Sequence, residues 1–243
     1  MEVICMTKIY EIGNFILRNY ILETSCGFIA IDTGYPEGQL AFIKKFQKIA
    51  PLSELKYIFL THAHDDHAGF LRSLLNECDA KVILNPVGIP VLEAGENKIL
   101  PGAGYSNRLA ASTFGKAKKE FNFPSVQLGD KAILINSEEE QFFESLGLPL
   151  KIVFLPGHTA DSIGLYDKSN NILFCGDAAM NAVISLGYHT IWIDDVTQFG
   201  QSWDKMIALN PKKIYPSHGN PFSPSKLQKY RHFMDKRKLI PIE

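Results

Sequence analysis

Short apolar runs alternate with polar or glycine-containing turns at the start of the chain. The runs include Val3-Ile4 and Phe15-Ile16-Leu17, and Gly13-Asn14 is one of the turns between them. Apolar runs of strand length bounded by such turns predict a set of antiparallel strands. Residues 38–49 carry apolar side chains at helical spacing, which predicts an amphipathic helix that ends near Pro51.

Further along, two apolar runs flank a helical pattern. Residues 57–60 and 80–84 each predict a short buried strand, and residues 68–75 between them predict a helix. A strand, a helix and a strand in succession are typical of a mixed α/β arrangement in layers.

The segment at residues 86–129 is irregular. Prolines and glycines interrupt it, although residues 107–121 have a helical pattern. Long irregular segments in compact domains are often functional, so this one could cover a substrate. We expect one domain, residues 1–243, with a helical or lid-like insertion at about residues 86–129.

Beyond the insertion, strand patterns return. Gly129-Asp130 predicts a turn between short strands in residues 125–135. The later apolar runs predict strands at residues 150–155, 162–166, 171–175 and 213–215, and a helix at residues 203–209.

The turn after residues 57–60 concentrates polar groups that bind metals. Its sequence is His62-Ala63-His64-Asp65-Asp66-His67, with three imidazoles and neighbouring carboxylates in six residues. On an extended backbone the side chains of His62 and His64 point the same way, while Asp66 and His67 at a helix start face a neighbouring position. A polar loop with an aspartate helix cap is the alternative, but imidazole and carboxylate together favour a metal site.

The same arrangement recurs later in the chain. His158, Asp177 and His218 each follow an apolar strand and adjoin a glycine. Functional groups on the loops at strand ends of a layered fold can meet at one edge, so these residues are expected to approach the first turn.

Together these motifs resemble the metallo-β-lactamase superfamily. Its pattern is His-x-His-x-Asp-His, followed by a His, an Asp and a final His, and the resemblance runs from about Asn14 to Phe222. It implies an α/β fold of the four-layer αββα type with two metals at one edge of the sheets. Carried over by position, the first metal would take His62, His64 and His158, the second would take Asp66, His67 and His218, and Asp177 would bridge them.

The ligand chemistry agrees with a catalytic centre. Imidazole and carboxylate without thiolate suit two divalent ions, zinc first, with iron or manganese as alternatives. Two adjacent dications would produce a bridging hydroxide at neutral pH, able to attack a carbonyl or phosphorus centre. Asp66 is the expected catalytic side chain, orienting this nucleophile or relaying a proton.

Departures from known subfamilies narrow the reaction. Only 25 residues follow His218, where glyoxalase II carries a glutathione-binding domain, and Met180 stands where acyl-homoserine lactonases have a tyrosine. Flavodiiron proteins have a glutamate at the position of His64, so this histidine counts against that class of redox enzyme. Zinc β-lactamases have a cysteine or no ligand at the position of Asp177.

The leading hypothesis is a hydrolase of a small-molecule ester, thioester or lactone. A phosphodiesterase of the same fold and a mono-iron sulfur dioxygenase are the alternatives. A metal-binding module without catalytic activity is a further hypothesis. Pocket contacts are expected from an aromatic-lined loop and the insertion. The residues concerned are His189, Tyr105, Trp192 and Met180.

Composition adds limits on partners and compartment. Lys plus Arg number 25 against 26 Asp plus Glu, a net charge of -1, which gives no global field for nucleic acid; the cluster at residues 116–119 is the local basic candidate. The expected partner is a small molecule, with no nucleic acid and no membrane. The sequence shows no export signal, which points to the cytoplasm, and four scattered cysteines are expected to be reduced, with Cys175 packed in the core.

Overall fold

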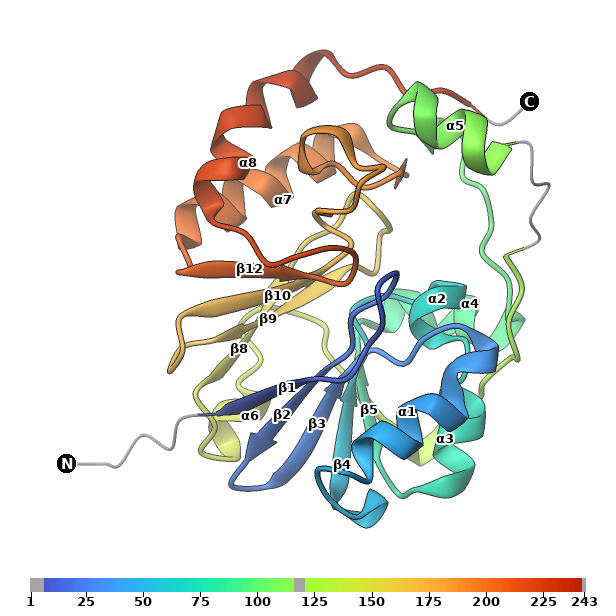
Figure 1. Cartoon of the computed structure of the whole chain (residues 1–243), viewed down its shortest axis with the longest axis vertical. Helices are drawn as coiled ribbons and strands as arrows, with labels where there is room; N and C mark the ends of the chain where they lie inside the picture. Colours follow the sequence, from blue (N-terminus) through green and yellow to red (C-terminus); the bar gives the residue numbers. More distant parts are fainter. Residues whose placement is uncertain (1–6, 116–120, 242–243) are drawn as a thin grey trace.

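Two β-sheets stacked face to face form the centre of the molecule (Figure 1). The computed structural model describes residues 7–115 and 121–241. The first sheet has the strand order β1-β2-β3-β4-β5-β7, where β1 to β3 are antiparallel and the later strands are parallel. Its strands are β1 (Lys8–Glu11), β2 (Tyr20–Thr24), β3 (Gly27–Ile31), β4 (Leu55–Phe59), β5 (Lys81–Leu84) and β7 (Ala132–Leu134).

The second sheet has the order β12-β10-β9-β8 and is antiparallel except where β10 pairs with β12. Its strands are β8 (Leu150–Phe154), β9 (Ile163–Asp167), β10 (Ile172–Gly176) and β12 (Lys213–Pro216). A two-stranded pair joins β6 (Gly104–Tyr105) to β11 (Trp192–Ile193).

Each strand contributes side chains to two different cores, because successive residues of a strand face opposite sides of its sheet. In β4, Phe59 packs between the two sheets while Ile58 packs against the outer helices. In β10, Phe174 lies between the sheets and Leu173 faces the opposite helices. The sheets are therefore apolar on both faces and need helices on both sides.

Those helices complete the layers. Beside the first sheet lie α1 (Gln39–Phe46), α3 (Leu71–Glu77) and α4 (Ile89–Ala94), and beside the second lie α7 (Val196–Leu209) and α8 (Pro224–Tyr230) (Figure 1). Phe46 and Leu74 fill the first outer core, and Trp203 and Leu227 fill the second. This arrangement is the predicted αββα fold.

The remaining short elements are helical. They are α2 (Asp65–Ala68), α5 (Arg108–Phe114), α6 (Phe142–Ser145) and the 3-10 turns η1 (Pro36–Gly38), η2 (Leu52–Glu54), η3 (Pro86–Gly88), η5 (Gly129–Lys131), η6 (Leu186–Tyr188) and η7 (Arg231–Lys236). Among the residues described, no helix is long and apolar enough to cross a bilayer.

The run at residues 15–17 is not a strand, so that prediction is wrong. The side chain of Asn14 accepts hydrogen bonds from the backbone N–H groups of Ile16 and Leu17, at 2.8 and 3.0 Å, which closes a turn instead of a ladder. The turn leaves Phe15 87% and Ile16 61% exposed. Val3-Ile4 lies outside the described residues.

Three other boundaries differ from the predictions. The helix expected at residues 68–75 is divided into α2 and α3 at Gly69, where a Cβ atom would lie 2.2 Å from the Asp65 carbonyl oxygen. No strand precedes Gly129 in the described part of residues 125–135. The helix expected from residue 203 begins at Val196, because the Asp195 side chain caps it by accepting from the Gln198 N–H.

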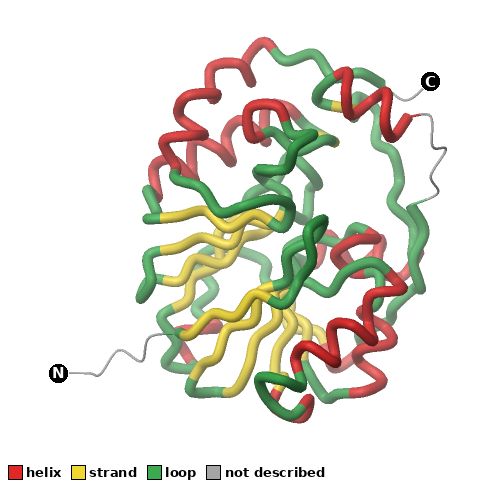
Figure 2. Tube along the Cα trace, in the orientation of Figure 1, coloured by secondary structure: helices red, strands yellow, loops and turns green. Residues whose placement is uncertain are grey.

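Residues 86–129 leave the first sheet after β5 and return at β7, two strands that pair directly. The described part of this excursion holds α4, β6 and α5 (Figure 2). A long loop joins α4 to β6, and residues 106–107 join β6 to α5. Residues 116–120, which include the basic cluster and part of the expected helix, lie outside the described residues. Through β6 the excursion contacts the loop that follows β10, and that a mobile lid forms here stays a prediction.

Candidate metal centre

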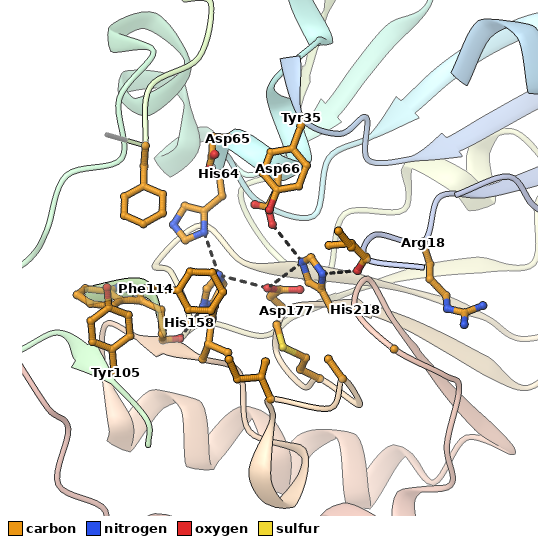
Figure 3. A pocket seen from close by; sticks show the side chains of 18 of the residues that line it. Arg18, Tyr35, His64, Asp65, Asp66, Tyr105, Phe114, His158, Asp177 and His218 are labelled. Carbon is orange, nitrogen blue, oxygen red and sulfur yellow. Dashed lines mark hydrogen bonds and ion pairs between the residues drawn. The ribbon is translucent and has the colours of Figure 1, made fainter. Parts of the chain in front are cut away.

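Side chains from four strand ends converge on one edge of the two sheets (Figure 3). The turn at residues 62–67 follows β4, His158 follows β8, Asp177 follows β10 and His218 follows β12. Most of these groups are nearly inaccessible, with His67 0% and His62 1% exposed. The structure thus brings together all seven residues that the sequence assigned to metals.

The first cluster consists of three imidazoles. His158 Nε2 lies 3.2 Å from His62 Nε2 and 3.0 Å from His64 Nδ1. His158 Nδ1 must donate to the carbonyl oxygen of Trp192, 2.8 Å away, so Nε2 keeps its lone pair toward the cluster. Burial lowers the pKa of His62 well below its usual value, that of His64 to about 3 and that of His158 to about 4. These rings are neutral near pH 7, as metal ligands must be.

The second cluster has the opposite electrostatics. His218 Nε2 lies 3.1 Å from Asp66 Oδ2, and His67 Nε2 lies 3.6 Å from Asp66 Oδ1. Burial disfavours the charged rings, but Asp66 and Asp32 outweigh it and raise the pKa of His67 to about 10. In the same way Asp177 and Asp66 outweigh burial and raise the pKa of His218 to about 9. Against the effect of burial, His67 and His218 hold the pKa of Asp66 below its usual range.

Asp177 lies between the clusters. Its Oδ1 is 3.7 Å from His67 Nε2, and its Oδ2 is 3.9 Å from His158 Nε2 and 3.7 Å from His218 Nε2. One carboxylate therefore faces rings of both clusters, which is the arrangement that a bridging ligand requires.

The donor set fits divalent metals. His67 Nε2 and Asp177 Oδ1 are buried atoms without a hydrogen-bond partner in the described part of the chain. Three groups have ligand atoms within 4.8 Å of one another: His62 with His64 and His158, His62 with His67 and Asp177, and Asp66 with His67 and His218. Buried nitrogen and oxygen donors in such number are costly without a cation to pair with.

Asp32 supports the turn at residues 62–67, which we call the metal turn. Its carboxylate accepts from the Thr61 N–H at 2.7 Å and the Thr61 hydroxyl at 2.8 Å, and Oδ2 lies 2.8 Å from His67 Nδ1. The bond to Nδ1 fixes the ring so that Nε2 faces Asp66 and Asp177. Asp32 is thus a supporting residue rather than a ligand.

Replacing Asp32 by asparagine should weaken metal binding by about 10- to 100-fold. Asparagine tolerates the positive φ of 58° at this position, but it offers one acceptor oxygen where the carboxylate offers two. Zinc titration against a chromophoric chelator measures the loss, with Asp130→Asn, whose side chain is 95% exposed, as the control. Affinity and proton release on zinc binding that both match those of the control variant would contradict the role given to Asp32.

Three residues of the site had no motif to announce them. Asp161 accepts from the Ala63 N–H at 2.9 Å, and Asn97 donates to the Ala63 carbonyl at 2.9 Å and accepts from the Asp65 N–H at 3.1 Å. Tyr35 places its hydroxyl against Asp66 (Figure 3). Each of these contacts joins residues far apart in the sequence, so an isolated polar residue such as Asn97 gave no local signal.

A cavity of about 420 Å³ opens over the two clusters, within the range of ~300–1,000 Å³ that is usual for small-molecule sites. Tyr105, Trp192 and Met180 line it, as the sequence suggested. His189 is not among its lining residues: the ring is 1% exposed and stacks on Trp203 with centroids 4.9 Å apart. This placement makes His189 a core residue, so its expected contact with substrate is corrected.

Cys175 is also a core residue. The thiol is 1% exposed and lies 3.6 and 3.7 Å from the backbone oxygens of Gly176 and Ala179. Burial raises the pKa of this thiol, so it stays protonated and does not join the donor set.

An αββα sandwich with histidines and aspartates gathered at one sheet edge defines the metallo-β-lactamase fold class. The chain belongs to the metallo-beta-lactamase superfamily, whose family model matches residues 20–218. All six residues of the two clusters, and Asp177 between them, fall inside this range.

Several known proteins are similar. The chain is 26% identical over 212 residues to the beta-lactamase-like protein 2 homolog of Caenorhabditis elegans, covering 85% of this chain and 58% of that protein. It is 29% identical over 217 residues to the lactamase-like protein aptB of Emericella nidulans, covering 88% and 55%. The chain thus spans a little over half the length of these relatives.

A solved structure shows the same fold. The crystal structure of an archaeal metallo-beta-lactamase superfamily protein from Sulfolobus tokodaii superposes with a TM-score of 0.66 at 23% identity, covering 98% of this chain and 90% of that one. At this identity the likeness concerns the fold alone.

Proposed function

We propose that the protein is a dinuclear metal-dependent hydrolase that cleaves a small-molecule ester, thioester or lactone. The observation that carries the proposal is the position of Asp177, whose two oxygens face histidines of both clusters. Zinc is the preferred metal because the donors are imidazole and carboxylate without thiolate, and iron or manganese are the alternatives.

Two such cations, when bound, would activate a water molecule as the nucleophile and polarise the electrophilic oxygen of the substrate. His62, His64 and His158 would hold one of them, and Asp66, His67 and His218 the other. This division follows the two clusters and the opposite pKa shifts of their rings.

Asp66 orients the water in this proposal. Its pKa is held below the usual range by His67 and His218, and a carboxylate this acidic accepts a proton poorly. Positioning through a hydrogen bond is therefore a better assignment for Asp66 than proton relay. The Tyr35 hydroxyl contacts Asp66 and keeps its proton, because burial and the nearby carboxylates raise its pKa.

The lining of the cavity favours a carbonyl substrate over a phosphodiester. Among the described lining residues the arginine and lysine side chains are Arg18 and Lys98. The Arg18 guanidinium already binds Glu11 and Asn220 and extends away from the histidines (Figure 3), and Lys98 is exposed. Neither adds a buried side-chain cation, so the charge of a phosphodiester would be balanced by the metals alone.

A substrate panel tests the reaction. Esters, thioesters, lactones and phosphodiesters are offered to zinc-loaded protein, to protein stripped with a chelator and to stripped protein with zinc restored. We expect turnover of a carbonyl substrate that disappears on stripping and returns with zinc. Turnover that survives stripping would refute the proposal, as would one iron per chain together with oxygen consumption on a persulfide.

A further inference from the structure

The cavity over the two clusters has two unlike parts. Its floor carries the charged and imidazole side chains, including Asp66, His158 and Asp177. Its walls carry large apolar side chains: Tyr105, Phe114, Phe121, Met180, Ile184 and Trp192. A substrate that fills it would place a polar, reactive group on the floor and an apolar group along the walls.

Most of the exposed residues that line the cavity are also apolar. Six of the residues that line the cavity are exposed, and four of them are apolar: Phe15, Ile16, Ile99 and Val183, with exposures of 87%, 61%, 55% and 90%, which we call the apolar rim. The other two are Lys98 and Asn220. Single exposed apolar residues are common on proteins, but a group of them around one concave site marks a binding surface.

The rim comes from three separate loops. Phe15 and Ile16 lie between β1 and β2, Ile99 between α4 and β6, and Val183 between β10 and β11. The Asn14 side chain and the backbone bond from the Arg18 N–H to the Ser217 oxygen, at 2.8 Å, hold the first loop beside His218. The exposure of Phe15 is thus set by specific contacts of its own loop.

We infer that the substrate is an ester, thioester or lactone that carries one large uncharged apolar group, a long alkyl chain or an aromatic ring system, and that the apolar rim and walls bind this group. The inference rests on the proposed hydrolase function for the identity of the reacting bond. The apolar binding region itself is argued from the polarity and position of residues outside both clusters.

A series of substrates measures the effect. Nitrophenyl esters with acyl groups from acetyl to decanoyl, and acetate esters of alcohols of growing length, are offered to the zinc-loaded protein. In at least one series kcat/KM should rise roughly two- to fourfold for each methylene that becomes buried. A flat response in both series would overturn the inference and leave the hydrolase proposal standing.

Substitutions in the rim test whether its residues cause the rise of kcat/KM with chain length. Phe15→Ser and Val183→Ser should each lower the ratio of decanoyl to acetyl kcat/KM by about fivefold or more, since an exposed side chain is exchanged without disturbing the core. Leu40→Ser is the matched control, because Leu40 is 80% exposed on α1 and does not line the cavity. An unchanged ratio in the rim variants would refute the role of the rim.

A binding experiment separates the two proposals. Straight-chain carboxylates from acetate to decanoate are titrated into the zinc-loaded protein by calorimetry, which requires no turnover. Affinity that grows with chain length without hydrolysis of any ester, thioester or lactone would support the apolar region and refute the hydrolase. If Phe15→Ser instead converted a dimer to a monomer in sedimentation and left the chain-length response intact, the rim would be a subunit interface and the inference would fail.

Discussion

Asp177→Ala is expected to reduce metal-dependent turnover by at least about a thousandfold, because metal-ion catalysis contributes several kcal/mol to the transition state. Its oxygens lie within 3.9 Å of ring nitrogens on His67, His158 and His218, so its loss affects both clusters. Metal content should fall below two per chain even with zinc in excess. Metal analysis after gel filtration and steady-state kinetics measure the two effects.

Asp177→Asn provides the conservative comparison. The amide keeps the shape and one oxygen, so we expect it to retain more metal than alanine while losing most of the turnover, since a neutral group does not balance two cations. Asp130→Ala, at an exposed side chain, controls for the loss of an aspartate as such. Two metals and undiminished turnover in Asp177→Ala would show that Asp177 does not bridge the clusters.

The convergence of the seven candidate ligands at one edge could be predicted because each of them follows an apolar strand, while their assignment to two metals came from the resemblance to the superfamily. The strand patterns at residues 57–60 and 171–175 indicated where buried strands end, and the sheet topology then brings their ends to one edge. Whether a residue directly follows a strand can be predicted from the residues next to it in the sequence. This is why His62 to His67, His158, Asp177 and His218 could be predicted together.

Other parts of the site depend on contacts that no local pattern displays. Phe15 looked like part of a strand, but the Asn14 side chain closes a turn and leaves it exposed beside the cavity. His189 looked like a pocket residue because aromatic residues surround it in sequence, but its ring stacks on Trp203 beneath the site. Asn97 reaches the metal turn from the irregular segment, across 34 residues of sequence. Each outcome was decided by tertiary packing.

The opposite pKa shifts of the two clusters have a consequence for metal loading. In metal-free protein near pH 7 the rings of His64 and His158, with pKa values of about 3 and 4, are already neutral. Those of His67 and His218, with pKa values of about 10 and 9, carry protons that a metal must displace. Metal binding at the second cluster should therefore compete with protons, whereas binding at the first should not.

We expect the first equivalent of zinc to release almost no protons at pH 7.5 and the second to release about two. Because each displaced proton changes the affinity tenfold per pH unit, the second affinity should fall about 100-fold per unit as the pH is lowered below about 9. The first affinity should stay level until the pH approaches the pKa of His158, about 4. Calorimetric titrations in buffers with different ionisation enthalpies count the protons at each step.

Asp32→Asn tests the electrostatic cause of this asymmetry. The Asp32 carboxylate is one of the charges that raise the pKa of His67, whereas Asp177 and Asp66 are the charges that raise the pKa of His218. The variant should therefore lower the number of protons released with the second zinc from about two toward one, by deprotonating His67 alone before metal arrives. Equal proton release for both equivalents in the unmodified protein would refute the assignment of the two clusters. The assignment requires neutral rings in the first cluster and protonated rings in the second, and equal release would mean that the two clusters are protonated alike.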